Sequence, residues 1–502
     1  MKKHLLLFVF CLTHLLASAQ DWSIRYVGNY PNGYIHFLDG IIDEDGVTFL
    51  VGHEGPNYDS PKALFMRIDS DGNPTVFKYN KTGFYSRATC IIELSDHKLF
   101  ASGNLYGDTD DYFMVWILDK DLNLLEERLY EKEVECNSFD FSRAVLDNNG
   151  NVIVSTCIVQ DNEFMGLDYR GVFFKFDQHG DTLCHRYLHK EYPDPVFFLN
   201  DFRVRQMWHK DEEESLLCLV SGQGGILSFV TFDSAFNYID EHPIWRDSID
   251  KSDHTLYKKD CFTDHWYSND EALFFSSLGD FEHNKLRVSR VNTHGEILDF
   301  IRLYERTDTI DDAASVRCMA TANDSTIYFS FHYHTWPYYP GIACVYLLND
   351  RLEIVGRHID DDHDCYRSCL ILPTSDGGCI TVNDSCQFIP TSHSRHPIIN
   401  KLSRSDFETV TLTVSDHQQR PTHHKAFPNP CEETLHIPLP GVESANIRCQ
   451  VFDNQGRTII NRMIPLSGNT LDLDVSKLRT GLYHYCIYSN QEALLTDTFI
   501  KQ

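Results

Sequence analysis

Two stretches of this sequence gather side chains that could bind a ligand. The first reads "HYHTWPYYPG" and carries two histidines and three aromatic residues, His332, His334, Trp336, Tyr338 and Tyr339. Clustered exposed aromatic rings are uncommon on a protein surface, and they form a platform on which sugar rings or peptides stack. The competing interpretation is a loop that is braced by its two prolines and packs on its own aromatic side chains.

The second stretch, "HIDDDHDC", carries hard oxygen ligands of the kind that Ca²⁺ prefers. Its carboxylates are Asp360, Asp361, Asp362 and Asp364. No EF-hand spacing with a glycine and a distal glutamate follows them, so a solvated acidic loop is the simpler interpretation. We predict no cofactor, and calcium is the one ion that this loop would suit.

Four cysteines near three histidines raise the same question for Zn²⁺. Cys365, Cys369, Cys379 and Cys386 have the spacing C-x₃-C-x₉-C-x₆-C, which is not a standard zinc pattern. A disulfide or buried thiols are the simpler interpretation. The turns "DEDG" and "DSDG" look like calcium loops, but tight turns with a following glycine favour the same residues.

Motifs of known catalytic mechanism are missing from the sequence. There is no G-x-S-x-G elbow, no phosphate-binding loop and no dinucleotide fingerprint, and "HEGPN" at His53 begins like a zinc-protease motif without completing it. Scattered loop carboxylates could still form an acid/base pair. The sequence therefore favours binding over catalysis and leaves an enzyme as the alternative.

A repeated unit positions these loops. Seven segments read as a strand, a tight polar turn and a second strand, and their turn residues are Asp69, Asp119, Asp177, Asp233, Asn292, Asn349 and Ser403. These marks recur at intervals of 50 to 59 residues, and a further hairpin precedes each one. Four-stranded antiparallel units with such a period are typical of propeller blades. We predict an all-β chain in which residues 20–414 form a seven-bladed β-propeller.

A closed ring must join its last blade to its first. The stretch "WSIRYVGNY" at residues 22–30 resembles an outer strand for the seventh blade, and residues 409–414 compete for the same place. Connectivity also places the loops after second and fourth strands on one face of the ring and the hairpin turns on the other. These loops are the longer connections and are rich in histidine, aspartate and aromatic residues, so we expect the binding site on this loop face.

The N-terminus has the pattern of a Sec signal peptide. A start containing Lys2 and Lys3 precedes an apolar run at residues 5–16 and a small-residue site that ends at Ala19. The run is too short for a membrane-spanning helix, which needs about 20 apolar residues. We predict cleavage after Ala19, so that residues 1–19 are removed, and we predict no transmembrane segment.

The net charge restricts the partners. A formal charge of −29 repels phosphate backbones and anionic lipid, which excludes nucleic acid and anionic membrane surfaces as partners. Sugars, divalent cations and basic proteins remain. Cysteine number adds one constraint, since 16 cysteines become an odd number once Cys11 leaves with the signal peptide, and an odd number cannot pair completely.

A second, smaller β-unit follows the propeller. After a polar linker at residues 415–425, alternating apolar residues separated by turn residues predict a small β-sandwich at residues 426–502. The pieces "FPNPCEETLHI", "CQVFDNQGRTII", "TGLYHYCIY" and "TDTFIK" occur in this order. Their motif residues are Pro428, Asn429, Pro430, Gly456, Arg457, Gly481, Tyr483 and Lys501. In this the segment resembles the C-terminal sorting domain (type A) of type IX secretion cargo in Bacteroidota.

The resemblance implies a route of export. Such a tail is recognised by the type IX secretion machinery in the outer membrane and is usually removed by a sortase-like surface peptidase. The cargo is then released or attached to surface lipopolysaccharide, so we expect a secreted or outer-cell-surface protein. The resemblance says nothing about the propeller, which we expect to bind an extracellular glycan or protein. The alternatives are an extracellular polysaccharide-degrading hydrolase or lyase with its site on the loop face, and a structural adhesin.

Overall fold

The structure of the chain is a computed structural model. It describes residues 21–30, 33–57, 60–107, 111–131, 138–139, 142–162, 166–188, 203–210, 214–221, 227–244, 266–268, 271–278, 285–303, 310–313, 319–323, 326–335, 338–360, 366–389, 392–409, 426–439, 447–453, 457–465, 470–489 and 492–502. The chain divides into two compact units. One comprises residues 1–245 and 255–410, and the other comprises residues 246–254 and 411–502.

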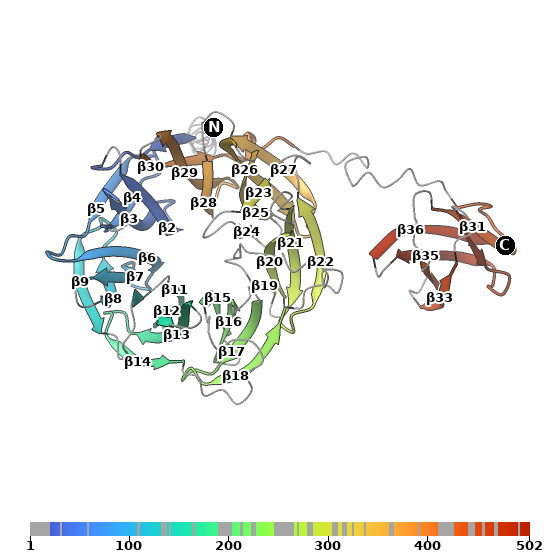
Figure 1. The fold of residues 1–502 in the computed structure, drawn as a ribbon, viewed down its shortest axis with the longest axis horizontal. Helices are drawn as coiled ribbons and strands as arrows, with labels where there is room; N and C mark the ends of the chain where they lie inside the picture. The colour runs from blue at the N-terminus through green and yellow to red at the C-terminus, as the bar shows by residue number, and fades with distance from the viewer. Residues whose placement is uncertain are drawn as a thin grey trace, which may run out of the picture. The chain divides into compact units, whose positions relative to one another are not determined.

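The first unit is a seven-bladed β-propeller, which confirms the predicted fold class (Figure 1). Blades 1 to 3 are β2 (Tyr34–Ile42), β3 (Thr48–Gly55), β4 (Lys62–Ile68) and β5 (Pro74–Lys78); β6 (Tyr85–Glu93), β7 (Leu99–Tyr106), β8 (Asp111–Leu118) and β9 (Leu124–Glu131); and β10 (Ser138–Phe139), β11 (Arg143–Leu146), β12 (Val152–Asn162), β13 (Gly166–Phe176) and β14 (Thr182–Tyr187). Blades 4 and 5 are β15 (Arg203–Lys210), β16 (Ser215–Ser221), β17 (Leu227–Phe232) and β18 (Tyr238–Pro243); and β19 (Trp266–Ser268), β20 (Glu271–Leu278), β21 (Lys285–Asn292) and β22 (Ile297–Leu303).

Blades 6 and 7 complete the ring. They are β23 (Ile310–Ala313), β24 (Met319–Asn323), β25 (Thr326–Thr335), β26 (Tyr338–Asn349) and β27 (Ile354–Asp360); and β28 (Tyr366–Pro373), β29 (Cys379–Ile389), β30 (Ser392–Leu402) and β1 (Trp22–Arg25). Figure 1 shows the first strand of each blade around the centre and strands such as β5, β9 and β18 at the rim. Apolar clusters fill the spaces between neighbouring blades, as where blade 2 residues Phe100 and Phe113 pack on Phe176 of blade 3.

The hairpin turns explain the periodic aspartates and asparagines. Asp69 is typical, because its Oδ1 accepts the backbone N–H groups of Asp71 at 3.0 Å and Asn73 at 2.8 Å, while Gly72 takes a left-handed φ of 87°. The same arrangement recurs at Asp119, Asp177, Asp233, Asn292 and Asn349. These side chains therefore stabilise turns, which accounts for the calcium-like sequence without an ion.

The seventh mark behaves differently, and this decides how the ring closes. Ser403 precedes a single 3₁₀ turn at Arg404–Asp406 in place of a hairpin turn. The chain then pairs with blade 6, where the backbone groups of Glu408 and Arg357 exchange hydrogen bonds of 2.8 and 3.1 Å. The place beside β30 is taken by β1, in antiparallel register from Trp22 opposite Lys401 to Arg25 opposite Ile398. The N-terminal strand thus completes blade 7.

Bulges interrupt the innermost strands and bring their carbonyl groups against the second strands. The register shifts between Ala88 and Cys90 in β6, and the facing residue of β7 is Gly103. A Cβ atom at Gly103 would lie 1.9 Å from the Arg87 carbonyl oxygen. Blade 1 repeats this geometry, because a Cβ at Gly52 would lie 2.0 Å from the carbonyl oxygen of His36. Glycine is therefore required at this position by space.

We expect Gly103→Ala to lower the free energy of unfolding by about 1–3 kcal/mol, because backbone atoms must shift to admit the methyl group. Thr75→Ala on the exposed outer strand β5 is the control, and its effect should stay within about 0.5 kcal/mol. Denaturant unfolding of both variants measures the difference. Equal stability of the two variants would show that the bulge is not a fixed feature of blade 2.

The second unit is a small β-sandwich, as the sequence predicts. One sheet pairs β31 (Thr434–Pro438) with β34 (Thr470–Asp474). The other has the order β33 (Thr458–Ile464), β32 (Ile447–Asp453), β35 (Gly481–Ser489) and β36 (Glu492–Lys501). Both sheets contribute to one core, which Leu435 and Leu473 enter from the first sheet and Val451 and Tyr485 from the second.

Candidate functional site

One register position of the second strand carries a polar or thiol side chain in blade after blade. Its residues are His53, Asn104, Cys157, His332 and Asp384, and all are buried. Each faces a residue of the third strand that lies six positions before the turn mark of its blade. The position is thus at the end of the strand that leads into the loop face, and buried polar groups there require hydrogen-bond partners.

Blades 7 and 1 bring two such groups together with a tyrosine and a second histidine. His36 of β2 lies with its Nδ1 atom 2.9 Å from Oδ2 of Asp384 in β29. Beside it, the Tyr34 hydroxyl lies 2.5 Å from Nε2 of His53 in β3. The rings of His36 and His53 are 6.0 Å apart, and those of Tyr34 and His53 are 5.1 Å apart. We call Tyr34, His36, His53 and Asp384 the junction cluster.

Burial determines the charge of this cluster. Its burial, followed by the positive charges of His36 and Arg87, holds the pKa of His53 well below the usual 6.5. His53 is therefore neutral at physiological pH, and its Nε2 atom can accept a hydrogen bond from the Tyr34 hydroxyl. The Asp384 carboxylate accepts a hydrogen bond from Nδ1–H of His36 and fixes that tautomer. Such a cluster can donate and accept hydrogen bonds, or protons, at one place.

Sequence reasoning missed the junction cluster. Its members are up to 348 residues apart in the chain and meet only because the ring closes between blades 7 and 1. One local signal was present, since His53 interrupts the apolar strand "TFLVG" at the register where the next blade has Asn104. Aligning the blades on their turn marks would have exposed this polar position.

We expect His53→Asn to flatten the acid dependence of stability. Because the pKa is depressed in the folded state, the unfolded chain takes up the proton first as the pH falls through 6.5. The free energy of unfolding of the wild type therefore decreases from that pH downward, by at most about 1.4 kcal/mol per pH unit. Asparagine, which blade 2 has at this register, does not titrate. Denaturant unfolding from about pH 8 to pH 5 measures the slope.

The control is His97→Asn, at a histidine whose side chain is 66% exposed in a tight turn. This variant should retain the wild-type slope. An unchanged slope in His53→Asn would contradict the assignment of a neutral, buried His53.

The predicted aromatic loop is wrong in one respect, because most of "HYHTWPYYPG" is strand. β25 continues to Thr335 and β26 begins at Tyr338, so only two residues separate them. Alternating histidine and tyrosine residues suit a β-ladder, and this extends the hairpin. His332 is buried in β25. Trp336 and the side chains of His334, Tyr338 and Tyr339 lie outside the described residues, so the platform stays a prediction.

The predicted metal ligands are divided in the same way. Asp360 ends β27 and accepts a hydrogen bond of 3.2 Å from the side-chain amide of Asn400, while Asp361, Asp362 and Asp364 lie outside the described residues. Within the described part of the chain, no three histidine, cysteine or acidic side chains meet in a way that could hold a metal ion. Cys379 is a free thiol, and burial raises its pKa far above the usual value.

In the C-terminal sandwich, the Pro-Asn-Pro segment binds the edge of the last strand. The prolines cannot donate backbone hydrogen bonds. The Asn429 side chain acts in their place, because its Oδ1 accepts the Ile500 N–H at 2.9 Å and its Nδ2 donates to the Thr498 carbonyl at 3.2 Å. Cys431 then continues the contact, donating its N–H to the Ile500 carbonyl at 2.8 Å. The residue types and spacing of this motif thus tie the segment at residues 428–431 to β36.

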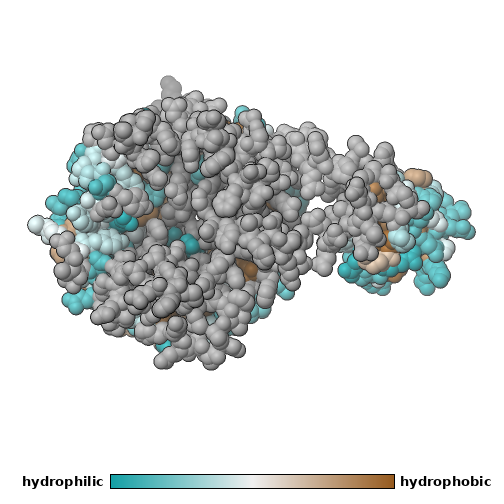
Figure 2. Space-filling model, in the orientation of Figure 1, coloured by the Kyte–Doolittle hydropathy of each residue, from teal (hydrophilic) through white to brown (hydrophobic). Residues whose placement is uncertain are grey.

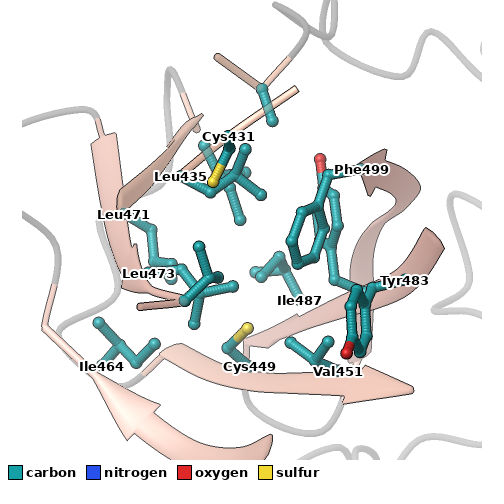
Figure 3. Close-up of a cluster of buried hydrophobic side chains, with 14 of the residues drawn as sticks. Cys431, Leu435, Cys449, Val451, Ile464, Leu471, Leu473, Tyr483, Ile487 and Phe499 are labelled. Atoms are coloured by element: carbon teal, nitrogen blue, oxygen red, sulfur yellow. The ribbon is translucent and has the colours of Figure 1, made fainter. Parts of the chain in front are cut away.

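The same segment joins the two sheets of the sandwich. Phe427 exchanges backbone hydrogen bonds of 2.8 and 2.9 Å with His436 of β31, so the segment runs from one sheet to the edge of the other. Figure 3 shows Cys431 and Cys449 pointing into the core with Leu435, Leu473 and Phe499. Burial raises the pKa of the Cys449 thiol to about 12, which makes it an apolar packing group. The core lies within this unit, so the sandwich has what it needs to fold alone.

Comparison with known families decides what this sandwich is. Residues 425–502 match the model of the secretion system C-terminal sorting domain. The tail is a type IX secretion sorting domain. It directs export of the protein to the cell surface or beyond. No curated protein matches the sequence.

Solved structures resemble the chain at the level of fold. The polysaccharide lyase Uly1 is 9% identical, with 75% of this chain and 93% of that chain covered and a TM-score of 0.46. Drosophila Semaphorin 2a is 8% identical over 96% and 97% of the two chains, with a TM-score of 0.43. Penicillium chrysogenum alpha-L-arabinanase is 9% identical over 64% and 93%, with a TM-score of 0.38. None of these likenesses bears on the activity of this chain.

The other motif residues of the sorting domain hold its turns and edges. Arg457 forms an ion pair with Asp453 at 2.7 Å, and the Tyr483 hydroxyl donates to the Arg479 carbonyl at 3.0 Å. Gly481 begins β35, Lys501 is buried at the end of β36, and Gly456 lies outside the described residues.

The described surface of the sorting domain is mostly hydrophilic, with a few apolar residues among the polar ones (Figure 2). Leu482 and Ile500 are two of these exposed apolar residues, and they are cross-strand partners on β35 and β36. In the part of the chain that the structure describes, no helix has the length and hydrophobicity needed to cross a membrane.

Proposed function

We propose that this protein is a ligand-binding propeller that reaches the outer surface of the cell by type IX secretion. A Sec signal peptide at residues 1–19 takes it across the inner membrane, and its sorting domain then engages the type IX secretion machinery. A sortase-like peptidase removes that domain and leaves the propeller released or attached to the surface. The observation that carries this proposal is the sorting domain itself, matched at residues 425–502 and built around its own core.

The propeller's ligand is an extracellular glycan or protein that binds on the loop face. Two observations support this choice of face. The hairpin turns are five-residue loops whose polar side chains are engaged by their own backbone, as at Asp69 and Asn73, so the turn face has few free groups for recognition. The junction cluster lies toward the ends of strands that lead into the loop face.

A second candidate function is an extracellular polysaccharide-degrading hydrolase or lyase. It is favoured by one observation, the pairing of His36 with Asp384 beside the pairing of Tyr34 with His53. Hydrogen-bonded pairs of this kind can position a general base and a general acid. The structure brings together imidazole and phenol groups here, whereas the sequence led us to expect a pair of carboxylates.

A glycan and protein array with the purified mature chain tests the proposal. The probes are neutral and acidic oligosaccharides and extracellular proteins, and the matched variants are Tyr34→Phe and Tyr85→Phe. Tyr85 is exposed at the start of β6 and lies outside the junction cluster. Binding that Tyr34→Phe weakens and Tyr85→Phe preserves would support a ligand at the cluster. Shortened oligosaccharides recovered from the array would favour the hydrolase or lyase, and neither binding nor cleavage would contradict both candidates.

A further inference from the structure

The N-terminal segment binds across the junction between blades 7 and 1. Trp22, Ile24 and Tyr26 pack against the apolar cluster that Leu50 and Leu64 of blade 1 share with residues of blade 7. The alternate residues face solvent, and Val27 is 50% exposed. The segment therefore has a two-residue period with one apolar face, which is how an extended strand covers a core.

Blade 7 holds this segment by a short ladder. β1 pairs with β30 over four residues, whereas β29 pairs with the same strand over eleven. Two further hydrogen bonds extend the contact. The Ser23 hydroxyl donates to Oδ1 of Asn400 at 2.6 Å, and the Tyr26 N–H donates to the Pro397 carbonyl at 3.1 Å.

Blade 1 grips the same segment from the other side. The Trp22 ring covers the β4–β5 turn so closely that a Cβ atom at Gly72 would lie 2.6 Å from it. The Lys78 ammonium lies 2.6 Å from the buried Glu54 carboxylate and 6.0 Å from the centre of the Tyr26 ring. Burial and the negative charge of Glu54 raise the pKa of Tyr26, which keeps this phenol neutral.

We propose that residues 21–28 form a detachable strap, bound in a strand-accepting groove between β30 and the Gly72 turn, whose release loosens the junction cluster. The groove fits an extended peptide with large apolar residues at every second position, and the chain's own N-terminus is its occupant. A four-residue edge strand is the kind of element that opens locally while the rest of the fold stays intact.

The strap and the junction cluster share their supporting residues. Glu54, which pairs with Lys78 under the strap, is the direct neighbour of His53 on β3. Beside them, Tyr34 is bridged to Arg395 of β30, the strand that carries the strap. When the strap leaves, blades 7 and 1 remain joined by that bridge and by their apolar contacts, so the His36–Asp384 pair is the polar link placed to open next.

Hydrogen exchange of the mature full-length chain, read by mass spectrometry, tests the strap. Trp22→Ala removes its largest apolar contact, Ile24→Ala is a milder second variant, and Val27→Ser is the matched control on the outward face of the segment. We expect Trp22→Ala to speed exchange in β30 and at the start of β2 on the order of tenfold or more, and to leave blade 3 unchanged. A synthetic peptide of residues 21–30 added in excess should restore slow exchange, and a peptide with alanine at positions 22, 24 and 26 should not.

Three results would overturn the proposal. They are exchange that accelerates equally in all blades, exchange that matches the wild type in both Trp22→Ala and Ile24→Ala, and failure of the peptide to slow exchange. The measurement needs no ligand, so its failure would leave the proposed binding function untouched.

Discussion

Removing residues 427–502 is expected to leave a folded propeller that stays in the periplasm. The sandwich core is made within residues 426–499, so its loss exposes no core of the blades. The propeller ring is closed by β1 and β30, which both precede the deletion. We therefore expect export to fall to background while the thermal melting of the remaining chain keeps its cooperative transition. Cell fractionation with immunodetection, beside calorimetry of the purified protein, measures both.

The control for this deletion is the full chain with Leu482→Ser, which changes an exposed residue of β35 outside the core and should remain a folded sandwich. Normal surface delivery of the truncated chain would contradict the role of the tail. Loss of the cooperative transition in the truncated chain would contradict the independence of the propeller.

Phe174→Ala is expected to cause one of the largest losses of stability in the propeller. Phe174 is buried in β13, and its ring stacks on that of Phe113 of the neighbouring blade at 4.9 Å. Truncation opens a cavity between two rigid sheets that cannot collapse into it, and such a change costs about 3–5 kcal/mol. Thermal and denaturant unfolding measure the loss. Leu183→Ala is the control, at a residue of β14 that is 53% exposed.

The triple variant Trp336→Ala, Tyr338→Ala and Tyr339→Ala belongs beside Phe174→Ala in the same experiment. If these aromatic residues form a stacking platform, the variant should keep most of its stability and lose ligand affinity, by about 1–3 kcal/mol for each stacked ring. A loss of stability as large as that of Phe174→Ala would identify them as packing residues. Unchanged stability with unchanged affinity would place the site elsewhere on the loop face.

Local patterns made the blades predictable. Each turn mark needs a side chain that accepts backbone N–H groups, and Asp69, Asp119 and Asn349 satisfy this within five residues of sequence. Such a constraint is short-range, so it repeats visibly along the chain. The sorting domain was predictable for the same reason, because the Asn429 side chain supplies hydrogen bonds that the flanking prolines cannot.

Contacts between distant parts of the chain were not predictable. Both residues 22–30 and residues 409–414 suit the place beside β30, and a strand pattern does not say which one pairs there. The structure gives it to β1, whose Trp22 also covers the turn at Gly72. The His36–Asp384 pair depends on that closure as well. Strand ends were a smaller difficulty, since the ladder of β25 and β26 extends into a stretch whose prolines suggested a loop.

The central claim is that the tail alone carries the export signal. Attaching residues 415–502 to a periplasmic carrier protein that is not otherwise exported tests this claim most directly, with protease accessibility on intact cells as the measurement. We predict that the carrier becomes accessible at the cell surface or appears in the medium. A carrier that remains in the periplasm, in cells that export the full-length chain, would contradict it.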